Sequence, residues 1–243
     1  MISPRRILCS GLWFAAVLIF LSSAALAGNV TAQLNNPPSN NILDSIYVGP
    51  YNGNNLSGGG SMQMICDDFK DDSDYNQATY TTHSLSNLTG TLWGGLQNAA
   101  VLYQEAGWLA AGMMTKTGAV QGYYSFALWA IFDPTDVLNW LKTAGDNSAC
   151  NYVFGATCAN VNLSSPAVGS LLYNAEQSYN YGSLNYSNML ILTPTCNGPH
   201  CEEQEFLVFT TPEGGSALLY LLLAGLACLG AVWQSRRRAP EVA

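Results

Sequence analysis

Charged residues are scarce in this chain: they make up 10% of its 243 residues, and only eight are lysine or arginine. So few basic side chains, with a formal net charge of −8, argue against nucleic-acid binding, which requires many phosphate contacts. Histidine is rarer still, and neither His83 nor His200 stands in a hydrolase motif. The sequence therefore predicts no catalytic residue, no metal site and no cofactor.

Hydrophobic residues, in contrast, are abundant at 49%, and aromatic residues reach 11%, as expected for a folded chain. The basic residues are unevenly placed, since five of the eight lie near the two ends. Between Gly28 and Thr211 there are three lysines and fourteen carboxylates, a formal charge of −11. The sequence thus predicts an acidic folded domain between two end segments of different character.

The first 27 residues have the layout of a secretory signal peptide. Arg5 and Arg6 precede an apolar run from Ile7 to Leu21, and the segment ends in Ala25-Leu26-Ala27. This pattern predicts export through the secretion machinery and cleavage by signal peptidase after Ala27. An uncleaved N-terminal anchor is the alternative.

The other end predicts a membrane segment. Residues 217–233 are apolar and uncharged, which is about the minimum length that crosses a bilayer. Arg236, Arg237 and Arg238 follow, and such a basic cluster remains in the cytoplasm. The sequence predicts one C-terminal transmembrane helix, with the main domain outside and residues 239–243 as a cytoplasmic tail.

Residues 211–238 resemble the sorting signal of the PEP-CTERM proteins, in which a Pro-Glu motif precedes a short apolar helix and terminal arginines. Pro212, Glu213 and Gly214 match the motif, with Gly214 where many members have a second proline. The resemblance implies processing by an exosortase in a Gram-negative bacterium. It also implies single-pass anchoring before processing, then a place at the cell surface or in the extracellular matrix, associated with exopolysaccharide. An ordinary single-span anchor is the alternative.

Five cysteines remain in the exported part, and four of them form pairs close in sequence. Cys150 with Cys158 and Cys196 with Cys201 are the disulfides expected in an oxidising compartment, which leaves Cys66 unpaired. Zinc binding at Cys196, His200, Cys201 and Glu203 is disfavoured because the spacing is unusual.

The exported part is predicted to be one α+β domain, residues 61–210, with strands at both ends and a central helical region, after a loop-rich segment at 28–60. Alternating or β-branched residues predict strands at 42–48, 61–66, 80–85, 189–193 and 205–210. Helical spacing of Leu102, Ala106, Leu109 and Met113, and further patterns at 119–132, 137–141 and 166–178, predict the helices.

Two segments, Cys66-Asp67-Asp68-Phe69 and the stretch around Trp129, resemble the thioester or TQXA-type domains of bacterial surface adhesins. In that family a cysteine sulfur is acylated by a glutamine four residues before a tryptophan. Cys66 and Trp129 match, but Ser125 stands at the glutamine position and has no carbonyl to acylate. Gln121 lies one helical turn earlier, which places its amide too far away without rearrangement. We expect Cys66 to be a buried free thiol or to form an intermolecular bridge.

The acidic run from Asp67 to Asp74 lacks the spacing of a calcium loop, which favours a solvated turn. Six aromatic residues could include a sugar-stacking platform, although helical spacing favours the core for most of them: Trp93, Trp108, Tyr123, Tyr124, Trp129 and Trp140. The sequence predicts an exported, non-enzymatic surface or matrix protein. The alternatives are an adhesin that links covalently through Cys66, and a secreted hydrolase.

Overall fold

The computed structural model describes residues 28–70, 75–180, 186, 188–195, 204–209 and 226. Six strands among these residues form a closed barrel in the order β1-β4-β5-β8-β7-β6, and β6 pairs with β1. All neighbouring strands are antiparallel. In chain order the barrel strands are β1 (Asn29–Leu34), β4 (Tyr51–Asn55), β5 (Gly60–Cys66), β6 (Gln77–His83), β7 (Met189–Pro194) and β8 (Phe206–Phe209).

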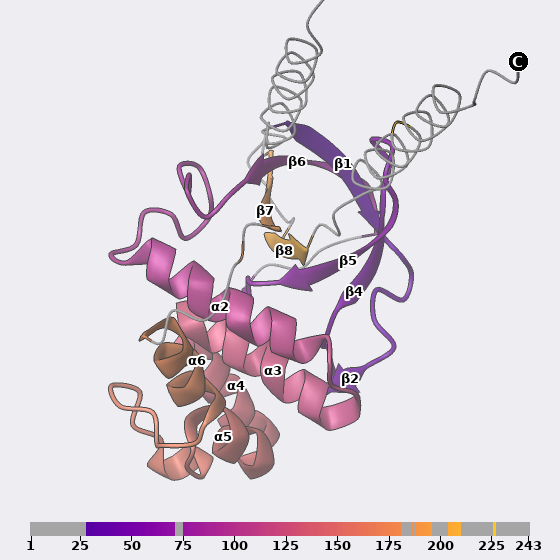
Figure 1. Ribbon diagram of the computed structural model, residues 1–243. Helices are drawn as coiled ribbons and strands as arrows, with labels where there is room; N and C mark the ends of the chain where they lie inside the picture. Colours follow the sequence, from indigo (N-terminus) through magenta and orange to yellow (C-terminus); the bar gives the residue numbers. More distant parts are fainter. Residues whose placement is uncertain are drawn as a thin grey trace, which may run out of the picture.

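The helices come between β6 and β7 in the chain, and Figure 1 shows them gathered on one side of the barrel. β7 and β8 then return to fill the gap between β6 and β5, which closes the barrel. The helices are α2 (Ala99–Met113), α3 (Gly118–Phe132), α4 (Pro134–Ala144), α5 (Asn147–Phe154), a 3-10 turn η1 (Cys158–Asn160) and α6 (Leu171–Asn180).

Local sequence signals explain where α3 ends and α4 begins. Pro134 cannot continue α3, and it occupies the first turn of α4, where its missing N–H is tolerated. Asp133 caps α4 by accepting a hydrogen bond from the Asp136 N–H at 3.3 Å. Gly145, with φ of 75°, ends α4 in the left-handed conformation that favours glycine.

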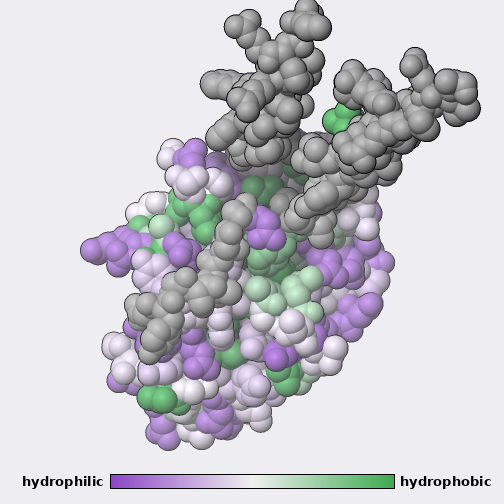
Figure 2. Space-filling view, viewed as in Figure 1, coloured by the Kyte–Doolittle hydropathy of each residue, from purple (hydrophilic) through white to green (hydrophobic). Residues whose placement is uncertain are grey.

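One continuous core joins the barrel to the helices. Inside the barrel, the rings of Tyr51 and Tyr80 both pack edge-on against Phe206, at 6.1 and 6.0 Å between centroids. On the face shown in Figure 2, hydrophobic residues form separate patches among hydrophilic ones outside the grey atoms.

A small hairpin between β1 and β4 packs against α3. Its strands are β2 (Ile42–Leu43) and β3 (Ile46–Tyr47), and the two turn residues between them have the positive φ angles of a tight hairpin turn. The chain then reaches Gly49, which has φ of +87°. A Cβ added there would lie 2.9 Å from Gln121 Oε1, so glycine allows the backbone to approach α3 closely.

The predicted fold class, an α+β domain with one C-terminal transmembrane helix, is wrong. The strands close into a barrel, and no helix in the described part of the chain is long and apolar enough to cross a membrane. Apart from Leu226, the predicted membrane segment 217–233 lies outside the described residues. The barrel was missed because residues 28–60, rich in Asn, Gly and Ser, predicted loops, yet they contain β1 and β4.

Candidate functional site

Cys66, the candidate reactive thiol, ends β5 and is buried, with 3% of its surface exposed. Among the described cysteines it is the one outside a disulfide. Its Sγ donates to the carbonyl oxygen of Asp68 at 2.8 Å. Burial raises the pKa of the Cys66 thiol well above its ordinary value, and the neighbouring Asp67 carboxyl raises it further. The thiol is therefore a poor nucleophile.

Trp129, the tryptophan of the proposed motif, does lie beside Cys66. The indole N–H donates to the Cys66 carbonyl oxygen at 3.0 Å, which ties the end of β5 to α3. The structure thus brings together the two residues that the resemblance paired, with the indole of Trp129 bonded to the backbone of Cys66.

Ser125 and Gln121, the candidates for the acyl partner, face a different neighbour. Ser125 Oγ accepts a hydrogen bond from the Gly49 N–H at 2.7 Å, in a buried position. The Gln121 amide donates to the Met113 carbonyl at 3.4 Å, and its side chain packs on Gly49. Both residues thus fasten α3 to the segment after β3, and neither supplies an acyl group to the free thiol.

A buried pair of carboxyl groups, Asp67 and Glu205, lies next to Cys66. Glu205 accepts hydrogen bonds from the Leu92 N–H at 2.8 Å and from the hydroxyls of Tyr103 and Thr193. Three donors therefore satisfy the carboxyl oxygens of Glu205. The pair joins the end of β5, the start of β8, the β6–α2 loop and α2.

Asp67 is fully buried, and no donor in the described part of the chain reaches either of its carboxyl oxygens. Desolvation, followed by the neighbouring Glu205 carboxyl, raises the pKa of Asp67 well above its ordinary value. A protonated Asp67 accounts for both observations, because its O–H can donate to Glu205. Asp67 and Asp68 are both buried, so the predicted solvated turn is wrong at these two positions, and residues 71–74 lie outside the described residues.

The residues that follow Asp67 in the chain line a cavity of about 460 Å³, hereafter the aromatic pocket. The pocket lies between the β2–β3 hairpin, the segment after β5, α3 and α4. Six aromatic side chains line it: Tyr47, Tyr51, Phe69, Tyr75, Trp129 and Trp140. Its volume falls within the range of small-molecule sites.

The aromatic side chains of the pocket extend from the core to the surface. Trp129 is buried, Phe69 lies 5.2 Å from it between ring centroids, and Trp140 lies 6.0 Å from Phe69. Trp140 and Tyr75 are 39% and 38% exposed, so a ligand can reach them. Of the two tryptophans in the wall, Trp129 thus belongs to the core, as expected for most of the six aromatic residues, whereas Trp140 is exposed.

Polar groups are interspersed with these rings. Asp68, Lys70, Gln204 and Ser45 also line the pocket. Lys70 Nζ lies 2.5 Å from Asp133 Oδ2 and 3.1 Å from Asp136 Oδ2, and these hydrogen-bonded carboxylates raise the pKa of Lys70 to about 12. The pocket thus combines apolar ring faces with hydrogen-bonding groups, as sites for small polar ligands do.

Sequence reasoning missed most of this pocket. The thioester resemblance grouped Cys66, Trp129, Ser125 and Gln121, and the possible sugar-stacking platform included Trp129 and Trp140. The hairpin and barrel residues that complete the wall are far apart in the chain. The one available signal was the acidic and aromatic stretch Asp68-Phe69-Lys70. All three of these residues line the pocket.

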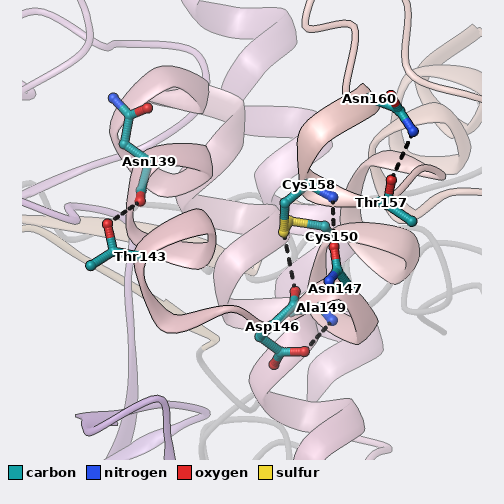
Figure 3. Close-up of a disulfide and its surroundings, with 9 residues drawn as sticks. All are labelled: Asn139, Thr143, Asp146, Asn147, Ala149, Cys150, Thr157, Cys158 and Asn160. Atoms are coloured by element: carbon teal, nitrogen blue, oxygen red, sulfur yellow. Dashed lines mark hydrogen bonds between the residues drawn. A yellow bond between two sulfur atoms is a disulfide. The ribbon is translucent and has the colours of Figure 1, made fainter.

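The disulfide lies between α5 and η1 (Figure 3). Cys150 and Cys158 are joined as the sequence favoured, with their Cα atoms 5.2 Å apart. Asp146 caps α5 by accepting from the Ala149 N–H at 2.9 Å, and Asn147 Oδ1 accepts from the Cys158 N–H at 3.1 Å. The bridge therefore reinforces a turn that hydrogen bonds already hold.

The other predicted site residues lie outside the described residues. These are the disulfide partners Cys196 and Cys201 and the sorting residues Pro212, Glu213, Gly214, Arg236, Arg237 and Arg238. Within the described ranges, no group of three histidine, cysteine or acidic residues is placed to hold a metal ion.

Comparison of the chain with protein-family models, with curated proteins and with solved structures gives no match. The function is therefore argued from the geometry of the aromatic pocket and from the residues of the two ends.

Proposed function

We propose that this chain is an exported, non-enzymatic protein of the cell surface or extracellular matrix of a Gram-negative bacterium, and that it associates with exopolysaccharide. The aromatic pocket is the observation that carries this proposal. A sugar ring has an apolar C–H face that packs on an aromatic ring and hydroxyl groups that bond to polar neighbours. Trp140 and Tyr75 supply exposed rings, and Gln204 and Ser45 supply polar groups.

The chemistry of the surrounding groups supports binding without catalysis. Cys66, Asp67 and Glu205 are each at most 3% exposed, so a ligand in the pocket does not reach them without a rearrangement of the core. Lys70 is held by two carboxylates and keeps its proton. A general acid or base needs a pKa near the working pH and access to the substrate.

Export is supported by the residues of the ends and by the disulfide. The signal-like residues 1–27 imply secretion, and the motif Pro212-Glu213-Gly214 with its terminal arginines implies recognition by an exosortase. The Cys150–Cys158 bridge suits an oxidising compartment.

The proposal is tested by expressing the full chain in a Gram-negative host that has an exosortase and an exopolysaccharide matrix. We expect the protein in the surface and matrix fractions. Trp140→Ala removes one wall of the pocket, so it should still be exported but should be released into the medium. Tyr179→Ala, a change of a similarly exposed aromatic residue on α6, should behave like the unchanged chain. Retention of the unchanged protein inside the cell, or cleavage of the polysaccharide by it, contradicts the proposal.

A further inference from the structure

A second cavity, of about 340 Å³, shares no lining residue with the aromatic pocket. We infer that this cavity, hereafter the amide pocket, is a further binding site, which holds a neutral saccharide through side-chain amides. Its volume falls within the range of small-molecule sites. The choice of a saccharide as ligand rests on the proposed function. Five amide side chains line the pocket: Asn40, Asn41, Asn52, Gln63 and Gln121.

The backbone places the two pockets next to each other. Pro38 and Tyr51 line the aromatic pocket, and the residues that follow them, Ser39 and Asn52, line the amide pocket. The Asn52 N–H donates to the Pro38 carbonyl at 2.6 Å, so the two segments are bonded to each other. A polymer that occupies both pockets is held more tightly than by either alone, so the loss of either pocket should weaken its retention.

Hydrogen bonds within the fold position part of the lining. Asn41 Nδ2 donates to the Gly118 carbonyl at 2.8 Å, which ties the start of the hairpin to the start of α3. Gln121 Nε2 donates to the Met113 carbonyl at 3.4 Å. Each of these amides keeps its oxygen as an acceptor. The pocket therefore has acceptors whose positions are set before a ligand arrives.

The other amides lie at the open side of the pocket. Asn52 on β4 and Gln63 on β5 are register partners, so their side chains lie side by side on one face of the sheet. Asn40 and Gln63 are exposed, and Asn52 is half-buried. An amide offers both donors and an acceptor, which matches a sugar hydroxyl because that group also donates and accepts.

The absence of charge in the lining specifies the kind of saccharide. No ionisable side chain occurs among the described residues that line the amide pocket. A uronic acid or a protonated amino sugar would lose part of its hydration there without gaining a counter-charge, and this desolvation is costly. A neutral saccharide avoids that cost and still forms hydrogen bonds with the amides.

The test is calorimetric titration of the full chain carrying Trp140→Ala, which removes part of the aromatic pocket and no residue of the amide pocket. The probes are neutral tetrasaccharides of glucose, galactose, mannose and N-acetylglucosamine, and charged ones of glucuronic acid and glucosamine. The buffer is mildly acidic, so that the glucosamine amines are protonated, and the detergent has no sugar headgroup. We expect the best neutral tetrasaccharide to bind at least tenfold more tightly than either charged one.

The double variant Asn40→Ala/Gln63→Ala, made in the Trp140→Ala chain, removes two exposed amides from the lining. It should weaken binding of the neutral tetrasaccharide roughly tenfold, because two hydrogen bonds to the ligand are lost. Gln97→Ala/Asn151→Ala is the matched control, since it removes the same two side-chain types from exposed positions outside the pocket and should leave the affinity unchanged. Circular dichroism and thermal unfolding check that each variant is folded.

The outcomes separate this inference from the proposed function. Three results overturn the amide pocket as a site for neutral saccharides: a charged tetrasaccharide that binds as tightly as the best neutral one, no binding of any neutral one to the folded Trp140→Ala chain, or undiminished binding after Asn40→Ala/Gln63→Ala. In each case the association with exopolysaccharide stands if the host experiment places the unchanged protein in the matrix. Absence of the unchanged protein from the surface and matrix fractions contradicts the proposed function itself.

Discussion

Glu105 offers the sharpest test of the electrostatics of the helices. It lies on α2, is 9% exposed and faces α6, where Glu176 carries a second carboxylate. Desolvation, followed by the charge of Glu176, raises the pKa of Glu105 from 4.5 to about 7. In the unfolded chain the pKa of Glu105 returns to its ordinary value of 4.5. The folded state therefore binds more protons than the unfolded state between these two values, so folding stability must fall as pH rises from about 4.5 to 7.

The size of the effect follows from the pKa difference. Each pKa unit corresponds to about 1.4 kcal/mol, so the full rise in the pKa of Glu105 would lower the free energy of unfolding by about 3 kcal/mol. Solvent still reaches part of the carboxyl and screens the charges, which reduces our expectation to about 1–2 kcal/mol. Glu105→Gln keeps the shape of the protonated side chain and cannot ionise. It should match the unchanged protein at pH near 4.5 and exceed its stability by about 1–2 kcal/mol above pH 7.

Urea unfolding of the full chain, followed by tryptophan fluorescence at several pH values between 4 and 8, measures this difference. Glu176→Gln is the matched control, because it removes the smaller of the two causes and should recover only part of the gain. A stability difference between Glu105→Gln and the unchanged protein that stays constant across the whole pH range would refute the reasoning.

Three further predictions concern the sulfur atoms and the buried carboxyl pair. Asp67→Asn keeps a donor for Glu205 but cannot ionise, and the pKa of Asp67 is raised in the folded state. As pH rises, this variant should therefore lose less stability than the unchanged protein, as measured by urea unfolding at neutral and alkaline pH. Because Cys66 is a free, buried thiol, the intact mass of the mature protein should show no loss of ~17 Da apart from the mass change of its disulfides, and methylamine should not add to Gln121. A methylamine adduct at Gln121 would show that a thioester exists. Replacing both Cys150 and Cys158 by serine opens a loop with a sequence separation of 8 and should lower the free energy of unfolding by about 2–3 kcal/mol, measured as a lower melting temperature. An unchanged melting temperature would mean that the capping hydrogen bonds hold this turn without the disulfide.

The helical part of the fold was largely accessible from the sequence because its signals are local. The spacing of Ala106, Leu109 and Met113 predicted a buried helix face, and all three are fully buried on α2. The helix predicted at 119–132 ends where α3 does, because the residue before Pro134 is disfavoured in a helix. α5 was missed because its eight residues are too few for a clear period, although Asp146 and Gly155 are typical cap residues.

The barrel was not accessible in the same way, because its closure depends on pairing between distant segments. β5 pairs with β8 through Ile65 and Leu207, far apart in the chain, and no local pattern specifies that choice. β4 has the sequence Tyr-Asn-Gly-Asn-Asn, whose asparagine and glycine residues favour turns over strands. Tertiary pairing overrides this local preference. The same long-range contacts assemble the aromatic pocket, so its wall was equally hidden.

The corner at the end of β5 explains why a cysteine, two aspartates and a tryptophan occur together without requiring a thioester. Consecutive residues there enter three environments: the Cys66 carbonyl accepts from Trp129, Asp67 meets Glu205, and Asp68 enters the wall of the aromatic pocket. The contact with Trp129 fastens the barrel to α3, whereas Glu205 precedes β8, the barrel strand that pairs with β5. Ser125 occupies the position of the acylating glutamine and accepts a hydrogen bond from the Gly49 N–H. Cys66, Asp67, Asp68 and Trp129 therefore position parts of the fold and form no thioester. The motif and the missing glutamine therefore have one physical explanation: the corner holds the pocket in place, and the sulfur remains a buried thiol.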